Sequence, residues 1–415
     1  MNRRSLLAAV GLSLAASVGL AVPAAAQQPP IKIGMSMPAT GGLAGGGKSS
    51  LIGIEIWRDD VNAKGGLLGR KVELVVYDDK SSASESPAIY AKLLDVDKVD
   101  LLFAPYASVQ TAPILPLVKE RGLLLMGNFS FQVNKVKHDM WFNNAPWGPA
   151  DSMARAFIDV GLKHGAKSLA ILAADQEFAQ NIVKTVKAVA AEKSVPAVYE
   201  QNYPPGTVEF SAMVRALKAA RPEMVYVASY PPDSVGILRA VNEIGVGDSI
   251  KIFGGGMVGL QFASNMEAMG SLLNGVVNFN TWLPEPTMSF DGTKEFFVKY
   301  GPRAVAAKVD PLGYYLAPFG YAMGQMVEAA VAATKGLDQK ALAKYLRENE
   351  HKTIVGPIAF SADGERKVSA TLLAQFRGVV DKNLEQFRGP GKQVILAPDN
   401  LKSGEAAVPF EKARK

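Results

Sequence analysis

The chain has 415 residues, a formal net charge of +6 and no cysteine. Its 45 basic and 39 acidic side chains are interspersed, so no nucleic-acid or membrane-surface footprint is indicated. The length exceeds what one hydrophobic core usually supports, and two domains are therefore expected. Without disulfides, the stability of these domains must come from core burial.

The N-terminal segment has the layout of a secretory signal peptide. Arg3 and Arg4 precede an apolar run that ends in three alanines, the last of which is Ala26. We expect residues 1–26 to be removed by cleavage near Ala26, and the mature protein to act in the periplasm without inserting into the membrane. The two arginines leave both the general and the twin-arginine export routes open.

Short apolar runs then alternate with amphipathic stretches. The first series predicts strands over 31–37, 72–79, 99–107 and 123–128, with helices over 48–64, 86–96 and 111–122 between them. A second series predicts helices over 150–165, 178–193, 211–220 and 233–245, and strands over 168–175, 196–203, 224–230 and 250–256. This alternation is typical of a parallel sheet covered by helices on both faces. The predicted fold is α/β, with two doubly wound parallel-sheet lobes.

Ligands of such sheets bind beyond the carboxyl ends of the strands. Hydroxyls and free backbone N–H groups at a helix start can hold a carboxylate, which favours Ser108 and Thr111. Asp78 and Asp79 are interpreted as structural residues. The candidate ligand-binding residues are Tyr106, Ser108, Thr111, Asn128, Phe129, Ser130, Asp175, Phe178, Tyr230, Gly256 and Met257.

One motif indicates a different function. Residues 42–49 read GLAGGGKS and match the phosphate-binding pattern G-x-x-x-x-G-K-[ST]. The alternative function is therefore a secreted nucleotide-binding enzyme. The compartment to which the protein is exported has no ATP pool, however, and glycine-rich loops match this short pattern easily. His138, His164 and His351 have no metal-ligand spacing, so we expect no catalytic residue, metal or cofactor.

Several segments resemble one known family. IKIGMSMPATGG, the NAKGG and VYDD segments, LLFAPYASVQTAPILPL, ILAADQEFAQN and TIVGPIAFSADGERK are similar to branched-chain amino acid (Leu/Ile/Val) periplasmic solute-binding proteins. The resemblance runs in order from Ile31 to about Leu396. It implies a type I periplasmic binding protein that delivers a small-molecule ligand to the membrane permease of an ABC importer. It also implies that the chain is not an enzyme. A monomer is expected, and a soluble sensor for a receptor is an alternative with the same fold.

The resemblance also implies three hinge crossings. They are expected near residues 143–147, 279–283 and 356–360. The implied division is 31–146 for the first part of lobe 1, 147–280 for the first part of lobe 2, 281–357 for the return to lobe 1, and 358–415 for the return to lobe 2 with the C-terminal tail.

The sequence departs from the family at one informative place. Members that bind amino acids have an acidic residue after the strand that ends near Gly256, to pair with the ligand's ammonium group. Residues 254–266 contain neither Asp nor Glu. We therefore expect an aromatic or aliphatic carboxylic acid as the ligand. An amino acid paired through Asp233 or Glu177, and an amide or urea-like solute, remain alternatives.

Overall fold

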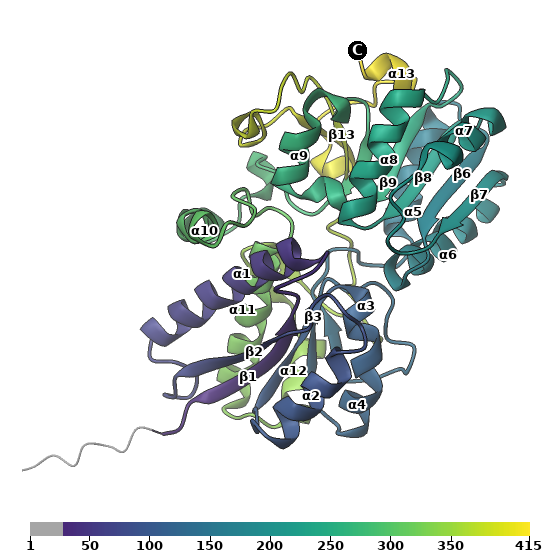
Figure 1. Cartoon of the computed structure of the whole chain (residues 1–415). Helices are drawn as coiled ribbons and strands as arrows, with labels where there is room; N and C mark the ends of the chain where they lie inside the picture. Colours follow the sequence, from purple (N-terminus) through teal and green to yellow (C-terminus); the bar gives the residue numbers. More distant parts are fainter. Residues whose placement is uncertain (1–27) are drawn as a thin grey trace, which may run out of the picture.

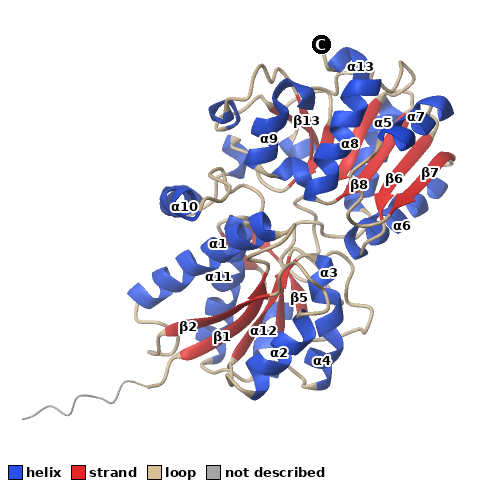
Figure 2. Cartoon of the chain, in the orientation of Figure 1, coloured by secondary structure: helices blue, strands red, loops and turns tan. Residues whose placement is uncertain are grey.

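The computed structural model describes residues 28–415 as two α/β lobes, each with a sheet flanked by helices (Figures 1 and 2). The predicted signal peptide lies outside the described residues. Within residues 28–415, no helix is both long enough and apolar enough to cross a membrane.

The first lobe contains a parallel five-stranded sheet with the order β2-β1-β3-β4-β5. Every residue of β3 and β4 is buried, because helices cover both faces of the sheet. The strands are β1 (Ile31–Met37), β2 (Val72–Asp78), β3 (Leu101–Tyr106), β4 (Leu125–Asn128) and β5 (Trp141–Asn143).

Side-chain alternation along β3 separates two cores. Phe103 packs in the cluster that includes α1 and α11, whereas Leu102 and Ala104 pack in a second cluster with α2 and α4. The helices of this lobe are α1 (Ala44–Ala63), α2 (Ser86–Asp95), α3 (Ser108–Thr111), α4 (Leu115–Glu120), α10 (Thr293–Ala307), α11 (Ala317–Thr334) and α12 (Gln339–Glu348).

Glycines allow α11 to pack closely against α1. A Cβ at Gly53 would lie 2.0 Å from the Ala317 carbonyl oxygen, and a Cβ at Gly324 would lie 2.0 Å from the Trp57 ring. No larger residue fits at either position without displacing the helices. Through this contact, α11 belongs to the first lobe, although most strands of the second lobe precede it in the chain.

The second lobe contains a seven-stranded sheet with the order β14-β13-β10-β9-β8-β6-β7. Its strands are β6 (Leu169–Ala174), β7 (Ala197–Tyr203), β8 (Met224–Ser229), β9 (Ile252–Met257), β10 (Val277–Asn280), β13 (Leu372–Phe376) and β14 (Gln393–Ala397). Its helices are α5 (Ser152–Lys163), α6 (Glu177–Glu192), α7 (Ser211–Ala220), α8 (Pro231–Ile244), α9 (Ala263–Met269) and α13 (Phe410–Ala413). The strands β6 to β10 are parallel, as expected for this fold class. By contrast, β13 is antiparallel to both of its neighbours. Antiparallel strands need no crossover helix between them, so β13 and β14 can follow each other directly.

The third crossing lies later in the chain than expected. Residues 358–366, which the sequence analysis assigns to the second lobe, contact β5 of the first lobe instead. They follow the hairpin β11 (His351–Thr353) and β12 (Gly356–Ile358). The Phe360 ring centroid lies 5.2 Å from that of Phe142, and the backbone N–H of Asn143 donates to the Gly364 carbonyl at 2.8 Å. The chain reaches the second sheet only at β13, because this segment first pairs with the end of β5.

Candidate functional site

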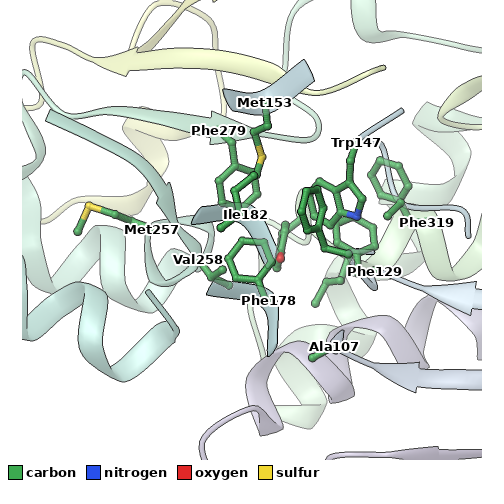
Figure 3. Packing of buried hydrophobic residues seen from close by; sticks show 14 of the residues in the cluster. Ala107, Phe129, Trp147, Met153, Phe178, Ile182, Met257, Val258, Phe279 and Phe319 are labelled. Carbon is green, nitrogen blue, oxygen red and sulfur yellow. The ribbon is translucent and has the colours of Figure 1, made fainter. Parts of the chain in front are cut away.

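Aromatic side chains from both lobes meet between the two sheets (Figure 3). Phe129, which follows β4, packs edge-to-face on Trp147 at 5.1 Å and on Phe319 at 4.8 Å between ring centroids. Phe131 of the first lobe lies 6.0 Å from Phe178 of the second. A single hydrophobic cluster therefore runs through both lobes, which are in contact here.

Two strained residues shape the first-lobe side of this interface. Ala107 has a φ of 81° directly after β3, and Phe129 has a φ of 57° directly after β4. Residues with a Cβ rarely adopt positive φ, and such strain concentrates at functional sites. The two turns direct the Ser108 and Ser130 segments toward each other.

The three candidate hydroxyls of the first lobe lie in one buried region, where Ser130 and Thr111 are hydrogen-bonded to each other and Ser108 is bonded to the residue after Ser130. Ser108 Oγ accepts a bond from the Phe131 amide at 2.8 Å, and Ser130 Oγ donates to Thr111 Oγ1 at 2.8 Å. Thr111 in turn donates to the Ala107 carbonyl at 2.9 Å. The Thr111 and Ser130 protons are thus used internally. The Ser108 proton has no acceptor within residues 28–415.

Tyrosines extend this polar group into the second lobe. The Tyr230 hydroxyl accepts a bond from the Phe178 amide at 3.2 Å, which leaves its own proton available. Burial raises the pKa of both Tyr106 and Tyr230, so both phenols are protonated at neutral pH. Tyr315 packs against Tyr106 at 6.4 Å and against Phe129 at 5.0 Å between ring centroids. Tyr315 is not among the candidate residues predicted from the sequence, because it lies far along the chain, just before α11.

The acidic candidates are already engaged or exposed. Asp233 accepts bonds from the Tyr203 hydroxyl at 3.2 Å and from the Tyr230 amide at 3.3 Å, and burial raises the pKa of its carboxyl. Glu177 forms an ion pair with Lys135 of the first lobe at 2.6 Å. Asp175 is exposed at the end of β6. Neither Asp233 nor Glu177 is left as a free partner for a ligand ammonium.

Three predicted site residues do not join the aromatic group. A Cβ at Gly256 would lie 3.2 Å from the Tyr226 ring, so the β9 glycines make room for that ring rather than for a ligand. The Met257 side chain points away from the aromatic cluster (Figure 3). Asn128 donates to Ser50 Oγ of α1 at 2.9 Å and is buried inside the first lobe. Strand alternation places successive side chains on opposite faces, and the position of a residue at a strand end does not by itself tell which face it occupies.

The glycine-rich segment does not form a phosphate-binding loop. The helix α1 begins at Ala44, so the residues up to Lys48 form its first turn, and the Lys48 side chain is exposed. Ser49 Oγ is hydrogen-bonded to the Tyr300 hydroxyl at 2.8 Å. Gly42, Gly45 and Gly46 instead line a cavity of about 410 Å³ between the lobes, opposite the start of α8.

Asp78 and Asp79 fasten the neighbouring turns. Asp78 accepts bonds from the Thr40 hydroxyl at 2.7 Å and from the Ala39 amide at 2.9 Å. Asp79 accepts a bond from the Ser36 hydroxyl at 2.8 Å, and burial raises its pKa to about 6. Their structural interpretation agrees with these contacts. Across residues 28–415, no group of three His, Cys, Asp or Glu side chains is arranged to hold a metal ion.

Comparison with known proteins places this architecture in a family. The chain is 25% identical over 372 residues to an amino acid binding protein of Pseudomonas aeruginosa, which covers 88% of this chain and 94% of that one. It is 25% identical over 339 residues to the Leu/Ile/Val-binding protein BraC3 of Rhizobium johnstonii, covering 81% and 88% of the two chains.

Solved structures share the fold. A leucine binding protein from Thermotoga maritima superposes with a TM-score of 0.72 at 20% identity, covering 84% of this chain and 96% of that one. An ABC transporter solute binding protein from R. palustris in complex with benzoate has a TM-score of 0.70 at 19% identity, covering 92% and 98%. The sequence profile of the periplasmic binding proteins matches residues 30–382. The chain belongs to the periplasmic binding protein family.

Proposed function

We propose that this chain is the substrate-binding component of an ABC import system, and that it binds a small carboxylic acid with an aromatic or aliphatic body between its lobes. The observation that carries the ligand class is a pair of buried hydroxyls with available protons, Ser108 and Tyr230, within an aromatic cluster. A carboxylate accepts such donors with short, charge-assisted bonds. The rings supply apolar surface for the rest of the ligand.

The surrounding charges favour an acid over an amino acid. Asp233 is engaged by Tyr203 and Tyr230, and Glu177 is paired with Lys135. Burying an ammonium group here without an anionic partner would cost on the order of several kcal/mol, and neither carboxylate is free to serve as that partner. The solved relatives with benzoate and with 3,4-dihydroxy benzoic acid support this ligand class, whereas the curated Leu/Ile/Val-binding relatives support the amino acid alternative.

Ligand binding and lobe closure form one linked equilibrium. A ligand that contacts both lobes stabilises the closed state in proportion to the contacts that exist only there. Besides the aromatic rings, the closed state contains the bond from Asn181 of α6 to the Phe131 carbonyl at 3.0 Å. We propose that a monomer in this closed state is what the membrane permease recognises in the periplasm. We propose that ligand binding requires no metal, nucleotide or covalent cofactor.

A thermal-shift screen of the mature protein tests the proposal. The panel contains benzoate, 3-phenylpropionate, 4-methylpentanoate, leucine, phenylalanine, benzamide and ATP with magnesium. A ligand at about 100 times its Kd should stabilise the protein by roughly 2.7 kcal/mol. We expect the acids to raise the melting temperature with and without EDTA. Stabilisation by ATP with magnesium alone, or loss of acid binding in EDTA, would contradict the proposal.

A further inference from the structure

The third crossing brings an acidic residue to the edge of the ligand site. After β12, a tight turn over residues 361–365 lies against the end of β5. Gly364 adopts a φ of +82°, and a Cβ there would lie 1.8 Å from the Trp141 carbonyl oxygen. This close approach places the next side chain, Glu365, beside Trp141 and Asn143 of β5.

Glu365 accepts two hydrogen bonds from that segment. Asn143 donates to Glu365 Oε2 at 2.8 Å, and the Trp141 indole donates to Glu365 Oε1 at 3.2 Å. A glutamine could accept only one of them, because its other terminal atom is itself a donor. These two bonds favour the ionised carboxylate, whereas burial has the larger effect and raises the pKa of Glu365 to about 7. The charged side chains around the adjoining cavity are Lys135, Lys184, Asp363, Arg366 and Lys367.

The same asparagine continues to the ligand site. The side-chain amide of Asn143 donates to the Ser130 carbonyl as well as to Glu365. The Ser130 carbonyl also accepts a bond from the Trp147 indole N–H at 2.9 Å. Ser130 Oγ in turn donates to Thr111 Oγ1 at 2.8 Å. The third crossing is thus hydrogen-bonded to the main chain of Ser130, and the side chain of the same residue is hydrogen-bonded to Thr111 at the lobe interface.

We infer that Glu365 is a positioning residue for ligand binding, which orients Asn143 and through it holds the Ser130 segment in its binding conformation. The inference rests on the proposed function for its effect on affinity. Its effect on the Ser130 segment is independent of any ligand. A residue that merely fastened the turn would change stability and leave the Ser130 carbonyl in place.

The test compares Glu365→Gln with Asp363→Asn. The control removes one carboxylate from the same turn and leaves the bonds of Asn143 and Trp141 in place, because the Asp363 carboxylate accepts from Ser361 Oγ and from the Glu365 backbone N–H instead. The first readout is the indole N–H resonance of Trp147 in the ligand-free protein, which reports its bond to the Ser130 carbonyl. The second is the Kd for 3-phenylpropionate by calorimetry.

We expect Glu365→Gln to shift the Trp147 resonance and to weaken binding about tenfold, with Asp363→Asn within twofold of the parent. Asn143→Leu, which removes the intermediate donor, should have the same two effects, and combining it with Glu365→Gln should add little. An unshifted Trp147 resonance in Glu365→Gln would overturn the inference, as would a Kd within twofold of the parent. If Glu365→Gln does not fold, the same two criteria apply to Asn143→Leu. A parent protein that binds no acid would refute the proposed function, and the Trp147 resonance would still decide the positioning role.

Discussion

Removing the Ser108 hydroxyl should affect both stability and binding. The side chain is buried, accepts a bond from the Phe131 amide at 2.8 Å and keeps its proton for a ligand. Ser108→Ala leaves the buried amide without a partner, which costs about 1 to 3 kcal/mol of unfolding free energy. It also removes a donor to a carboxylate, worth about 1.5 to 3 kcal/mol. The Kd should therefore rise roughly 10-fold to 100-fold.

Thr111→Val is the matched comparison. In the parent protein, the Thr111 hydroxyl already donates its proton to the Ala107 carbonyl, and its oxygen accepts a bond from Ser130. The variant should lose stability by a similar amount, but its Kd should rise less than about fivefold, which is about 1 kcal/mol. Urea unfolding gives the stabilities, and calorimetry with 3-phenylpropionate gives the affinities. An affinity of Ser108→Ala within twofold of the parent would refute the role of this hydroxyl.

Three further predictions concern the core, the lobe contact and pH. Phe129→Ala should lower the unfolding free energy by about 3 to 5 kcal/mol in urea, because a buried ring packed on Trp147 is lost; a loss below about 1 kcal/mol would contradict this packing. Lys135→Met removes the exposed ion pair to Glu177 across the lobes, so the Kd should rise less than about fivefold and the difference should fade at 1 M salt; a larger effect that survives salt would be inconsistent with a screened pair. The pKa of Asp79 is about 6 when folded, against about 3.9 when unfolded, so the folded chain binds its proton more tightly and this carboxyl lowers stability as pH rises through that window. Relative to the parent, Asp79→Asn should therefore gain about 2 kcal/mol between pH 4 and pH 7 in urea unfolding, and a pH-independent difference would show that the carboxyl is not desolvated.

Local pattern was sufficient for much of the fold. The strand predicted over 31–37 coincides with β1, because a run of apolar residues between turn signals has few alternatives in a sheet covered on both faces. The third crossing was misplaced. The turn that carries Glu365 is held by a contact between Gly364 and β5, more than 200 residues earlier in the chain, and such a contact leaves no local signal.

The site was predictable only in part. The strand-end rule selected Tyr106, Ser108 and Phe129, which the structure brings to the lobe interface. It also selected Met257, whose side chain points away from the aromatic cluster, because the rule does not say which face a strand-end residue occupies. Tyr315 was missed since only the return of α11 to the first lobe brings its ring against Phe129.

The measurement that tests the central claim most directly is a calorimetric titration of matched ligands, 3-phenylpropionate against phenylalanine, with the unmodified mature protein. The two differ by the ammonium group alone. Because Asp233 and Glu177 are already engaged, the acid should bind at least tenfold more tightly, which is about 1.4 kcal/mol. Tighter binding of phenylalanine would contradict the account and would show that one of these carboxylates is released to pair with the ligand.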